Sequence, residues 1–221
     1  YSAAMSLPLV VMLSGSFEYD SEESLLILRD YLLANADLQC ELVVFSSEGD
    51  SPSLVALDDA DAIVVFTRRL LTQGAELERL QQYCSNGRPV VGLRTASHAF
   101  QHWLEFDRDV LGGHYEGHHD SSMSLDIELV PQSTTHPILQ GVQPFTACGS
   151  LYRNPPIAKA TSLLLSGHQG EHHEPVAWTC ERAGRAFYTS LGHQGDFWEL
   201  DFLRLVRNGI LWSLNQPSTA R

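Results

Sequence analysis

Three histidines stand within eight residues in the stretch GGHYEGHH, which spans residues 112–119. The imidazole ring changes charge near neutral pH, so it can move protons, and its neutral form binds transition metals. Gly112, Gly113 and Gly117 allow positive φ angles, which would let the backbone approach a ligand closely. The stretch therefore predicts either a solvated His-rich loop or one wall of a functional site.

A second candidate for proton chemistry lies downstream in LGHQGDFW. His193 follows an expected strand, and Asp196 stands three residues further along, where its carboxylate could orient the ring or bind with it. The alternative is that His193 only hydrogen-bonds to a loop carbonyl. His98 and His102 are four residues apart, so on a helix they would share one face. That spacing permits a metal site, but without an HExxH pattern it favours a packed helix face for His102.

A catalytic transition-metal site needs about three protein ligands and one open position. His118, His193 and one of His98, His114 or His119 could supply three imidazoles. No fixed spacing enforces this set. The cofactor is therefore unknown from sequence: a divalent transition metal stays open, and no residue is assigned as a metal ligand.

The elements expected to position these groups alternate between strands and helices. Short apolar runs at residues 7–13, 41–45, 61–66 and 89–93 predict buried strands. A helix is expected after the capping-box pattern Asp20–Glu23, and another over residues 73–86 before Gly87. This alternation is typical of an α/β fold with a mostly parallel sheet that is covered on both faces.

The second half of the chain has a different pattern. Residues 125–129 alternate between apolar and acidic side chains, and segments 175–179 and 185–190 flank the turn ERAG, which predicts an antiparallel hairpin. His172 and His173 are expected in a loop, and an amphipathic helix is expected from about 199 to 214. With no linker or internal repeat, residues 1–221 are predicted to form a single domain.

In open parallel sheets, ligands bind beyond the carboxyl ends of the strands. The sequence VVGL-RTAS-HAF reads there as a strand, a sharp turn and a helix. Arg94 at the turn, with Thr95 and Ser97 beside it, would face a ligand from the sheet edge. Arginine is not a nucleophile, but its guanidinium could hold a carboxylate or an enolate oxygen.

The composition limits the possible partners. A formal net charge of −13 argues against nucleic acid and anionic membranes, because both need basic patches. No apolar run is long enough to span a bilayer, and the four cysteines, in no CxxC pair, are expected to be small buried apolar groups. The expected partner is a small molecule. A homo-oligomer stays open, as does the compartment: the cytoplasm, or export after signal removal, since the chain starts at Tyr1 rather than Met.

A series of segments in this order resembles one known family: GLRTASHAF, LGGHYEGHH, HPILQGV, LYR, PVAWT, GRAFYTSLGH and NGILW. The chain is similar over nearly its whole length to the ThuA-like (trehalose utilisation) family of the class I glutamine amidotransferase-like superfamily. The resemblance implies a flavodoxin-like three-layer sandwich, with a mostly parallel sheet and an antiparallel C-terminal extension. It also implies a sugar or keto-sugar as the ligand.

The resemblance supports some site residues and removes others. Arg94 stands where true amidotransferases carry a nucleophilic cysteine, so Cys-dependent glutamine hydrolysis is not expected. Many ThuA-like proteins have a histidine at that turn and an Asp-Glu pair where this chain has Gly149–Ser150. The residues that match are His118, Tyr152, Trp178 and His193. The first and last of these are therefore the leading catalytic candidates, and the other two are candidates for ligand binding.

Three functional hypotheses follow. In the first, the protein binds or transforms a small polar metabolite by acid–base chemistry, with His118 and His193 moving protons while Arg94 holds an oxyanion. In the second, it is a non-catalytic binding module, which the missing cysteine and Asp-Glu pair favour. In the third, converging histidines bind a metal for hydrolysis. Whether the protein is an enzyme therefore depends on whether Arg94, His118 and His193 face one another.

Overall fold

The computed structural model describes residues 6–120, 124–157 and 159–218. The described residues form one nine-stranded sheet of order β2-β1-β3-β4-β11-β10-β9-β6-β7 and one two-stranded sheet. Five strands at one side of the large sheet are parallel: β1 (Leu9–Gly15), β2 (Gln39–Val44), β3 (Ala62–Thr67), β4 (Val90–Leu93) and β11 (Ala186–Thr189). Their order, 2-1-3-4-5 if β11 is counted fifth, is the flavodoxin-like order and confirms that prediction.

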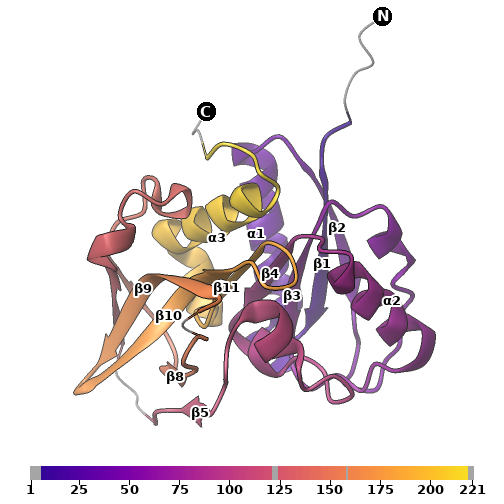
Figure 1. Ribbon diagram of the computed structural model, residues 1–221, viewed down its shortest axis with the longest axis horizontal. Helices are drawn as coiled ribbons and strands as arrows, with labels where there is room; N and C mark the ends of the chain where they lie inside the picture. Colours follow the sequence, from indigo (N-terminus) through magenta and orange to yellow (C-terminus); the bar gives the residue numbers. More distant parts are fainter. Residues whose placement is uncertain (1–5, 121–123, 158, 219–221) are drawn as a thin grey trace, which may run out of the picture.

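Antiparallel strands extend the sheet beyond β11 (Figure 1). They are β10 (His172–Cys180), β9 (Thr161–Gln169), β6 (Leu125–Leu129) and β7 (Phe145–Ala147). The two-stranded sheet pairs β5 (Gly117–His118) with β8 (Tyr152–Arg153). The predicted hairpin around ERAG is confirmed. The expected loop at His172 and His173 is wrong, because both residues lie in β10 and the turn comes earlier, at Gly170 and Glu171.

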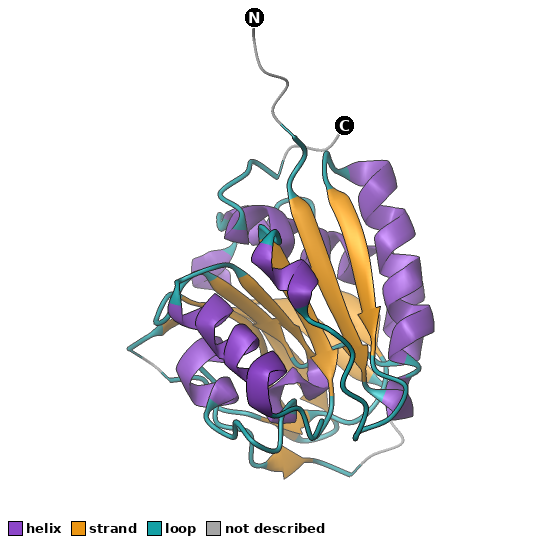
Figure 2. Ribbon diagram, turned by 90° about the vertical axis from the view of Figure 1, so that its right-hand side faces the viewer, coloured by secondary structure: helices purple, strands orange, loops and turns teal. Residues whose placement is uncertain are grey.

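Helices cover both faces of the parallel half (Figure 2). On one face, α1 (Ser21–Asn35) and α3 (Leu200–Ser213) pack apolar side chains such as Leu28 and Phe202 against the sheet. On the other face, α2 (Gly74–Ser85) and the segment 99–111 form a second apolar cluster. Strand β3, between these two layers, is buried along its whole length and is almost entirely apolar, as expected of a strand covered on both faces.

Short helical turns connect these elements. They are η1 (Phe17–Tyr19), η2 (Val55–Asp58), η3 (Arg94–His98), η5 (Pro131–Ser133), η6 (Pro137–Leu139) and η7 (Gln194–Trp198), all 3₁₀, and the π-helical η4 (Asp107–Leu111). The expected helix after Arg94 is wrong: it is only the 3₁₀ turn η3, so His98 and His102 share no helix face. The predicted capping box is also wrong. Asp20 precedes α1 with a left-handed φ of 45° and makes no side-chain cap bond.

Candidate active site

The sharp turn predicted after the fourth strand is present at Arg94. This residue has a φ of 43°, in the left-handed region that non-glycine residues rarely occupy. The Tyr188 hydroxyl donates a hydrogen bond of 2.7 Å to the Arg94 carbonyl oxygen and holds the turn from beneath. Backbone strain of this kind persists only where surrounding contacts enforce it, and it is concentrated at functional sites.

The Arg94 side chain is buried beneath the carboxyl edge of the sheet, with 1% of its surface exposed. Its Nη1 donates to the Ser190 carbonyl oxygen at 2.9 Å, and its Nη2 lies 3.3 Å from the Ser150 carbonyl oxygen. The guanidinium carbon lies 4.6 Å from the ring centre of Tyr19 and 4.6 Å from that of Tyr152. Arg94 is thus a buried cation between two tyrosine rings. This corrects its expected role, because a covered guanidinium cannot clamp a ligand oxygen directly.

Gly149 is what allows the following loop to close over this cation. Its φ is 83°, and an added Cβ would lie 2.8 Å from Arg94 Nη2 and 3.2 Å from His193 Cδ2. The same backbone position is therefore in contact with both side chains. Arg94 and His193, which are far apart in sequence, meet under one loop.

His193 lies half-buried beside Tyr19, at 5.9 Å between ring centres in an edge-on arrangement. Its Nδ1 accepts a hydrogen bond from the Gly195 backbone N–H at 3.2 Å, so the neutral ring carries its proton on Nε2. Burial and the nearby Arg94 charge lower the pKa of His193 below its ordinary value. The ring is neutral at pH 7 and can accept a proton there.

Asp196 does not orient the His193 ring, as the sequence suggested. Its buried carboxylate accepts backbone N–H bonds from Cys148 at 2.8 Å, Gly192 at 3.0 Å and His193 at 3.1 Å. Burial nevertheless raises the pKa of this carboxyl group, and those bonds oppose the rise. Asp196 ties the loop at Cys148 to the loop at Gly192 and His193, and direct ligand binding by this residue is corrected to a supporting role.

His118 reaches the same site from the other side. It lies in β5, which pairs with β8 and brings its ring 6.4 Å from that of Tyr152 in a stacked arrangement. Its Nδ1 lies 3.4 Å from the Asp120 carboxylate, and 46% of its side chain is exposed. His118 and His193 therefore contact different members of the tyrosine pair that encloses Arg94.

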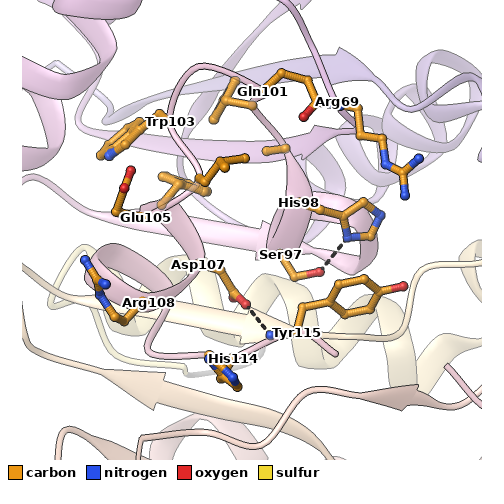
Figure 3. Close-up of a pocket in the computed structure, with 15 residues that line it drawn as sticks. Arg69, Ser97, His98, Gln101, Trp103, Glu105, Asp107, Arg108, His114 and Tyr115 are labelled. Carbon is orange, nitrogen blue, oxygen red and sulfur yellow. Dashed lines mark hydrogen bonds between the residues drawn. The ribbon is translucent and has the colours of Figure 1, made fainter. Parts of the chain in front are cut away.

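A cavity of about 380 Å³ adjoins this cluster (Figure 3). His98 and Tyr115 form one wall, with their rings stacked at 4.4 Å, and Tyr115 lies 5.0 Å from Tyr152. Ser97 hydrogen-bonds to His98 Nδ1 at 2.9 Å. Burial, followed by the charges of nearby arginines, lowers the pKa of His98 to about 3. Like His193, His98 stays neutral at pH 7.

The loop that carries Tyr115 is held from below by two buried side chains. The Tyr115 N–H donates to Asp107 Oδ2 at 2.9 Å, and the His114 N–H donates to Asn154 Oδ1 at 2.6 Å. Burial raises the pKa of Asp107 to about 6. The His114 side chain itself is exposed and lies 3.6 Å from Glu116, at the rim of the cavity.

Two predicted ligand-binding residues lie outside the site. Trp178 is fully buried in the apolar cluster, where its indole N–H donates to the Leu111 carbonyl oxygen at 2.8 Å. Thr95 is also fully buried and donates to Ser16 Oγ at 2.9 Å. Both predictions are corrected, because motif position alone does not distinguish a core residue from a wall of a pocket.

The described part of the chain contains no group of three His, Cys, Asp or Glu side chains arranged to hold a metal ion. His119 instead contacts Glu174 at 2.8 Å and stacks on His172 at 3.8 Å, away from His193. Nor does any helix in the described ranges have the length and apolar character needed to cross a membrane.

Sequence reasoning missed several residues here. None of Tyr19, Tyr115 and Arg69 was given a role, although Tyr115 belongs to the segment LGGHYEGHH. Cys148 was expected to be buried but is exposed beside the site: a Cβ on Gly195 would lie 2.8 Å from its Sγ. Burial and Asp196 raise the pKa of Cys148, so it is a thiol rather than a thiolate.

Comparison with known proteins agrees with the fold and with the family resemblance. The model of the ThuA family, described as trehalose utilisation, matches residues 12–213. No curated protein is similar enough in sequence to count as a match.

Solved structures share the architecture at low sequence identity. A ThuA-like protein from Bacteroides uniformis is 18% identical, with a TM-score of 0.73 over 96% of this chain and 93% of that one. A ThuA-like protein from Parabacteroides merdae is 17% identical, with a TM-score of 0.75 over 96% and 92%. A glutamine amidotransferase from Thermotoga maritima is 11% identical, with a TM-score of 0.58 over 95% and 99%. At such identities the likeness concerns the fold alone.

Proposed function

Because this chain belongs to the ThuA (trehalose utilisation) family, we propose that it binds a sugar or keto-sugar and transfers a proton on it with His118 and His193. The ligand would lie over the carboxyl edge of the parallel strands, where open α/β sheets bind their ligands. The name of the family supports a carbohydrate. The chemistry of the side chains at this edge supports proton transfer.

One observation carries the proposal. The Arg94 guanidinium lies between Tyr19 and Tyr152, and each of these rings is in contact with one of the two histidines. A cation that is nearly free of water acts over a longer range than one on the surface, because the surrounding medium screens it less. It can therefore stabilise negative charge that develops on a ligand above it without touching that ligand.

The reaction that suits this arrangement is proton transfer next to a carbonyl group. One neutral imidazole takes the proton from the carbon beside the carbonyl, and the C–H electron pair forms a carbon–carbon double bond as the carbonyl oxygen becomes an enolate oxygen. The field of Arg94 favours that oxygen anion. The proton then returns to a different atom, so the product is an isomer and no oxidant is required. His193 is assigned as the base, because its lowered pKa keeps the ring unprotonated at pH 7.

This reaction needs no nucleophile, which fits the site. Arg94 occupies the turn where a nucleophile would stand, and Cys148, the exposed cysteine nearby, has a raised pKa. A thiol is a much weaker nucleophile than a thiolate. Acyl transfer to a cysteine is therefore the less favoured chemistry.

A thermal-shift screen of sugars, keto-sugars and divalent metals first identifies compounds that bind. The test is then the exchange of solvent deuterium into the keto-sugars that bind, monitored by NMR. We expect the wild-type protein to catalyse exchange at the carbon beside the carbonyl. Replacing His193 or His118 with glutamine should slow that exchange about 100-fold or more, as expected for the loss of a general acid or base. His102→Gln is the matched control, because His102 is exposed and does not line the cavity.

A wild-type rate no faster than buffer, with ligand bound, would leave the second candidate: a binding module without catalysis. The burial of Arg94 favours that candidate, because its Nη1 and Nη2 already contact carbonyl oxygens of Ser190 and Ser150. Equal exchange by wild-type protein and both histidine variants would exclude His118 and His193 as the proton carriers.

A further inference from the structure

Three arginines lie together at the carboxyl ends of two adjacent strands. Arg68 and Arg69 follow β3, and Arg94 follows β4. The chain has only 14 basic residues against 27 acidic ones, so a group of three cations is not what its average composition would place there. Burial, and after it the charges of these three arginines, lower the pKa of His98.

The three arginines differ in burial and in whether a carboxylate already pairs with the guanidinium. Arg68 lies 3.3 Å from the Glu18 carboxylate and 4.0 Å from that of Glu48. Arg94 is buried between its two tyrosine rings. Arg69 is exposed, lines the cavity and forms no ion pair with any carboxylate in the described ranges. Its guanidinium is therefore the cation in this group that a ligand can reach.

The backbone conformation and one backbone hydrogen bond fix the position of Arg69. Its φ is 49°, and its N–H donates to the His98 carbonyl oxygen at 2.9 Å, which ties it to the wall of the cavity. Figure 3 shows the Arg69 guanidinium beside the His98 ring, on the same side of the cavity as the Tyr115 hydroxyl. Glu105 and Arg108 lie at the opposite side in that view.

From this placement we propose that the ligand carries an anionic group, a carboxylate or a phosphate, which the Arg69 guanidinium binds. The planar fork of arginine matches two oxygens of either group. The ligand class thus becomes a sugar acid or a sugar phosphate. This inference rests on the proposed function, because it adds a charge to the ligand expected at the same site. The Tyr115 hydroxyl, on the same side of the cavity, is a neutral donor for the same oxygens.

The test compares ligands that differ only in charge. Isothermal titration calorimetry would measure the binding of D-glucose, D-glucuronate and D-glucose 6-phosphate to the wild-type protein at low and high salt. We expect at least one anion to bind about 10-fold or more tightly than D-glucose, as one charge-assisted contact implies. The advantage should shrink as salt rises, because the guanidinium is exposed. Comparing D-glucuronate with D-glucose 6-phosphate shows whether the site prefers a carboxylate or a phosphate.

The matched variants are Arg69→Gln and Arg108→Gln. Both residues are exposed arginines that line the same cavity, but Arg108 is already 2.8 Å from the Asp109 carboxylate. Arg69→Gln should weaken binding of the anion about 10- to 100-fold and leave D-glucose within about 3-fold. Arg108→Gln should change neither.

The other outcomes separate this inference from the proposed function. Equal affinity for the neutral and charged sugars would show that Arg69 does not distinguish ligands by charge. Loss of binding of both kinds of sugar in Arg69→Gln would show the same. The proposed function would then stand on its own exchange experiment. Tight, Arg69-dependent binding of an anion without proton exchange would instead support this inference and contradict the catalytic proposal. No binding by any of the three probes would reject an anion contact at Arg69.

Discussion

Arg94 is a buried cation beneath the candidate site, and the proposed function gives it an electrostatic role there. The Arg94 side chain is 1% exposed, but it packs against the rings of Tyr19 and Tyr152. Each of these rings is in contact with one of the two histidines. A buried cation is costly unless its donors are paired. Here carbonyl oxygens pair Nη1 and Nη2 and two aromatic faces cover the guanidinium, but the buried Nε has no hydrogen-bond partner among the described residues. The cost makes sense if the positive field has a use at the surface above it.

Removing this charge should be visible in the titration of His193. In Arg94→Met, the pKa of His193 should rise toward its ordinary value, because a nearby positive charge disfavours the imidazolium. NMR titration of the imidazole resonances measures it. His136 provides a control within the same spectrum, since its lowered pKa arises from burial and from Arg185. An unchanged His193 pKa would show that the field of Arg94 does not reach the site.

The activity should depend on pH in the same sense. A general base works only when unprotonated, and His193 has a folded pKa below about 6.5, its ordinary value. The value of kcat/KM for proton exchange should therefore stay constant as the pH falls from 8 to about 6.5 and decline only below that. In Arg94→Met the decline should begin at a higher pH. A wild-type profile that falls between pH 8 and 7 would contradict His193 as the base.

Residue types and motifs predicted the turn at Arg94, which the structure shows, and made His118 and His193 the leading candidates for proton transfer, which stays a prediction. They could not predict which side chains face outward. Thr95 and Ser97 are both buried, and Trp178 is a core residue although it belongs to a recognised motif. Arg69 and Tyr115 were missed because neither a position after a strand nor a position in a glycine-rich segment shows which side chain lines a cavity. Exposure is a property of the folded chain, and it decides which of these residues a ligand can touch.

At the scale of elements, the segment from η4 to β5 forms one wall of the site. Asp107 and Asn154 hold its backbone N–H groups, and Gly113 allows them to approach: an added Cβ would lie 2.4 Å from Asp107 Oδ1 and 2.7 Å from Asn154 Oδ1. The close approach of this glycine-rich stretch to a ligand stays a prediction. The approach that the structure shows is toward these two buried side chains, as well as toward the cavity.

Gly113→Ala should therefore destabilise the protein by about 1–3 kcal/mol, the usual cost of overpacking a tight interior. It should also move Tyr115 and weaken ligand binding. Urea denaturation and calorimetry measure the two effects. Gly49→Ala is the control, because nothing lies within 4 Å of a Cβ at that position. Equal stability of the two variants would mean that the segment does not depend on this contact.

Asp107 should make stability depend on pH. Its folded pKa of about 6 lies above the unfolded value of about 3.9, so the folded state binds more protons between these values. The contribution of Asp107 to the free energy of unfolding is favourable below pH 4 and is lost as the pH rises to about 6. The loss is about 3 kcal/mol at most. In Asp107→Asn this loss should be absent. Urea denaturation at pH 4, 5, 6 and 7 tests it, and identical pH dependence in both proteins would refute it.

At the scale of the whole molecule, the nine-stranded sheet joins two halves of different character. β11, from late in the chain, pairs with β4 from the first half and with β10 of the antiparallel extension. The site forms at this junction, where loops from both halves meet. The α/β class followed from apolar runs and spacing, because strands buried on both faces have a distinctive pattern. The flavodoxin-like order of strands was an implication of the family resemblance.

This continuity predicts that the chain unfolds as a single unit. Circular dichroism and tryptophan fluorescence should report the same denaturation midpoint, because breaking the junction between β11 and β10 exposes apolar surface of both halves. Trp178 in β10 and Trp212 in α3 report on the two parts. Two separate transitions would show that the extension is a second domain.

The account depends most on the carboxyl edge being the ligand site. The direct measurement is an NMR titration of wild-type imidazole resonances with the keto-sugar that most raises the melting temperature. We predict that His193, His118 and His98 shift together, while His136, His168 and His173 do not. Shifts confined to the latter three, or a raised melting temperature with no shift at His193 and His118, would contradict it.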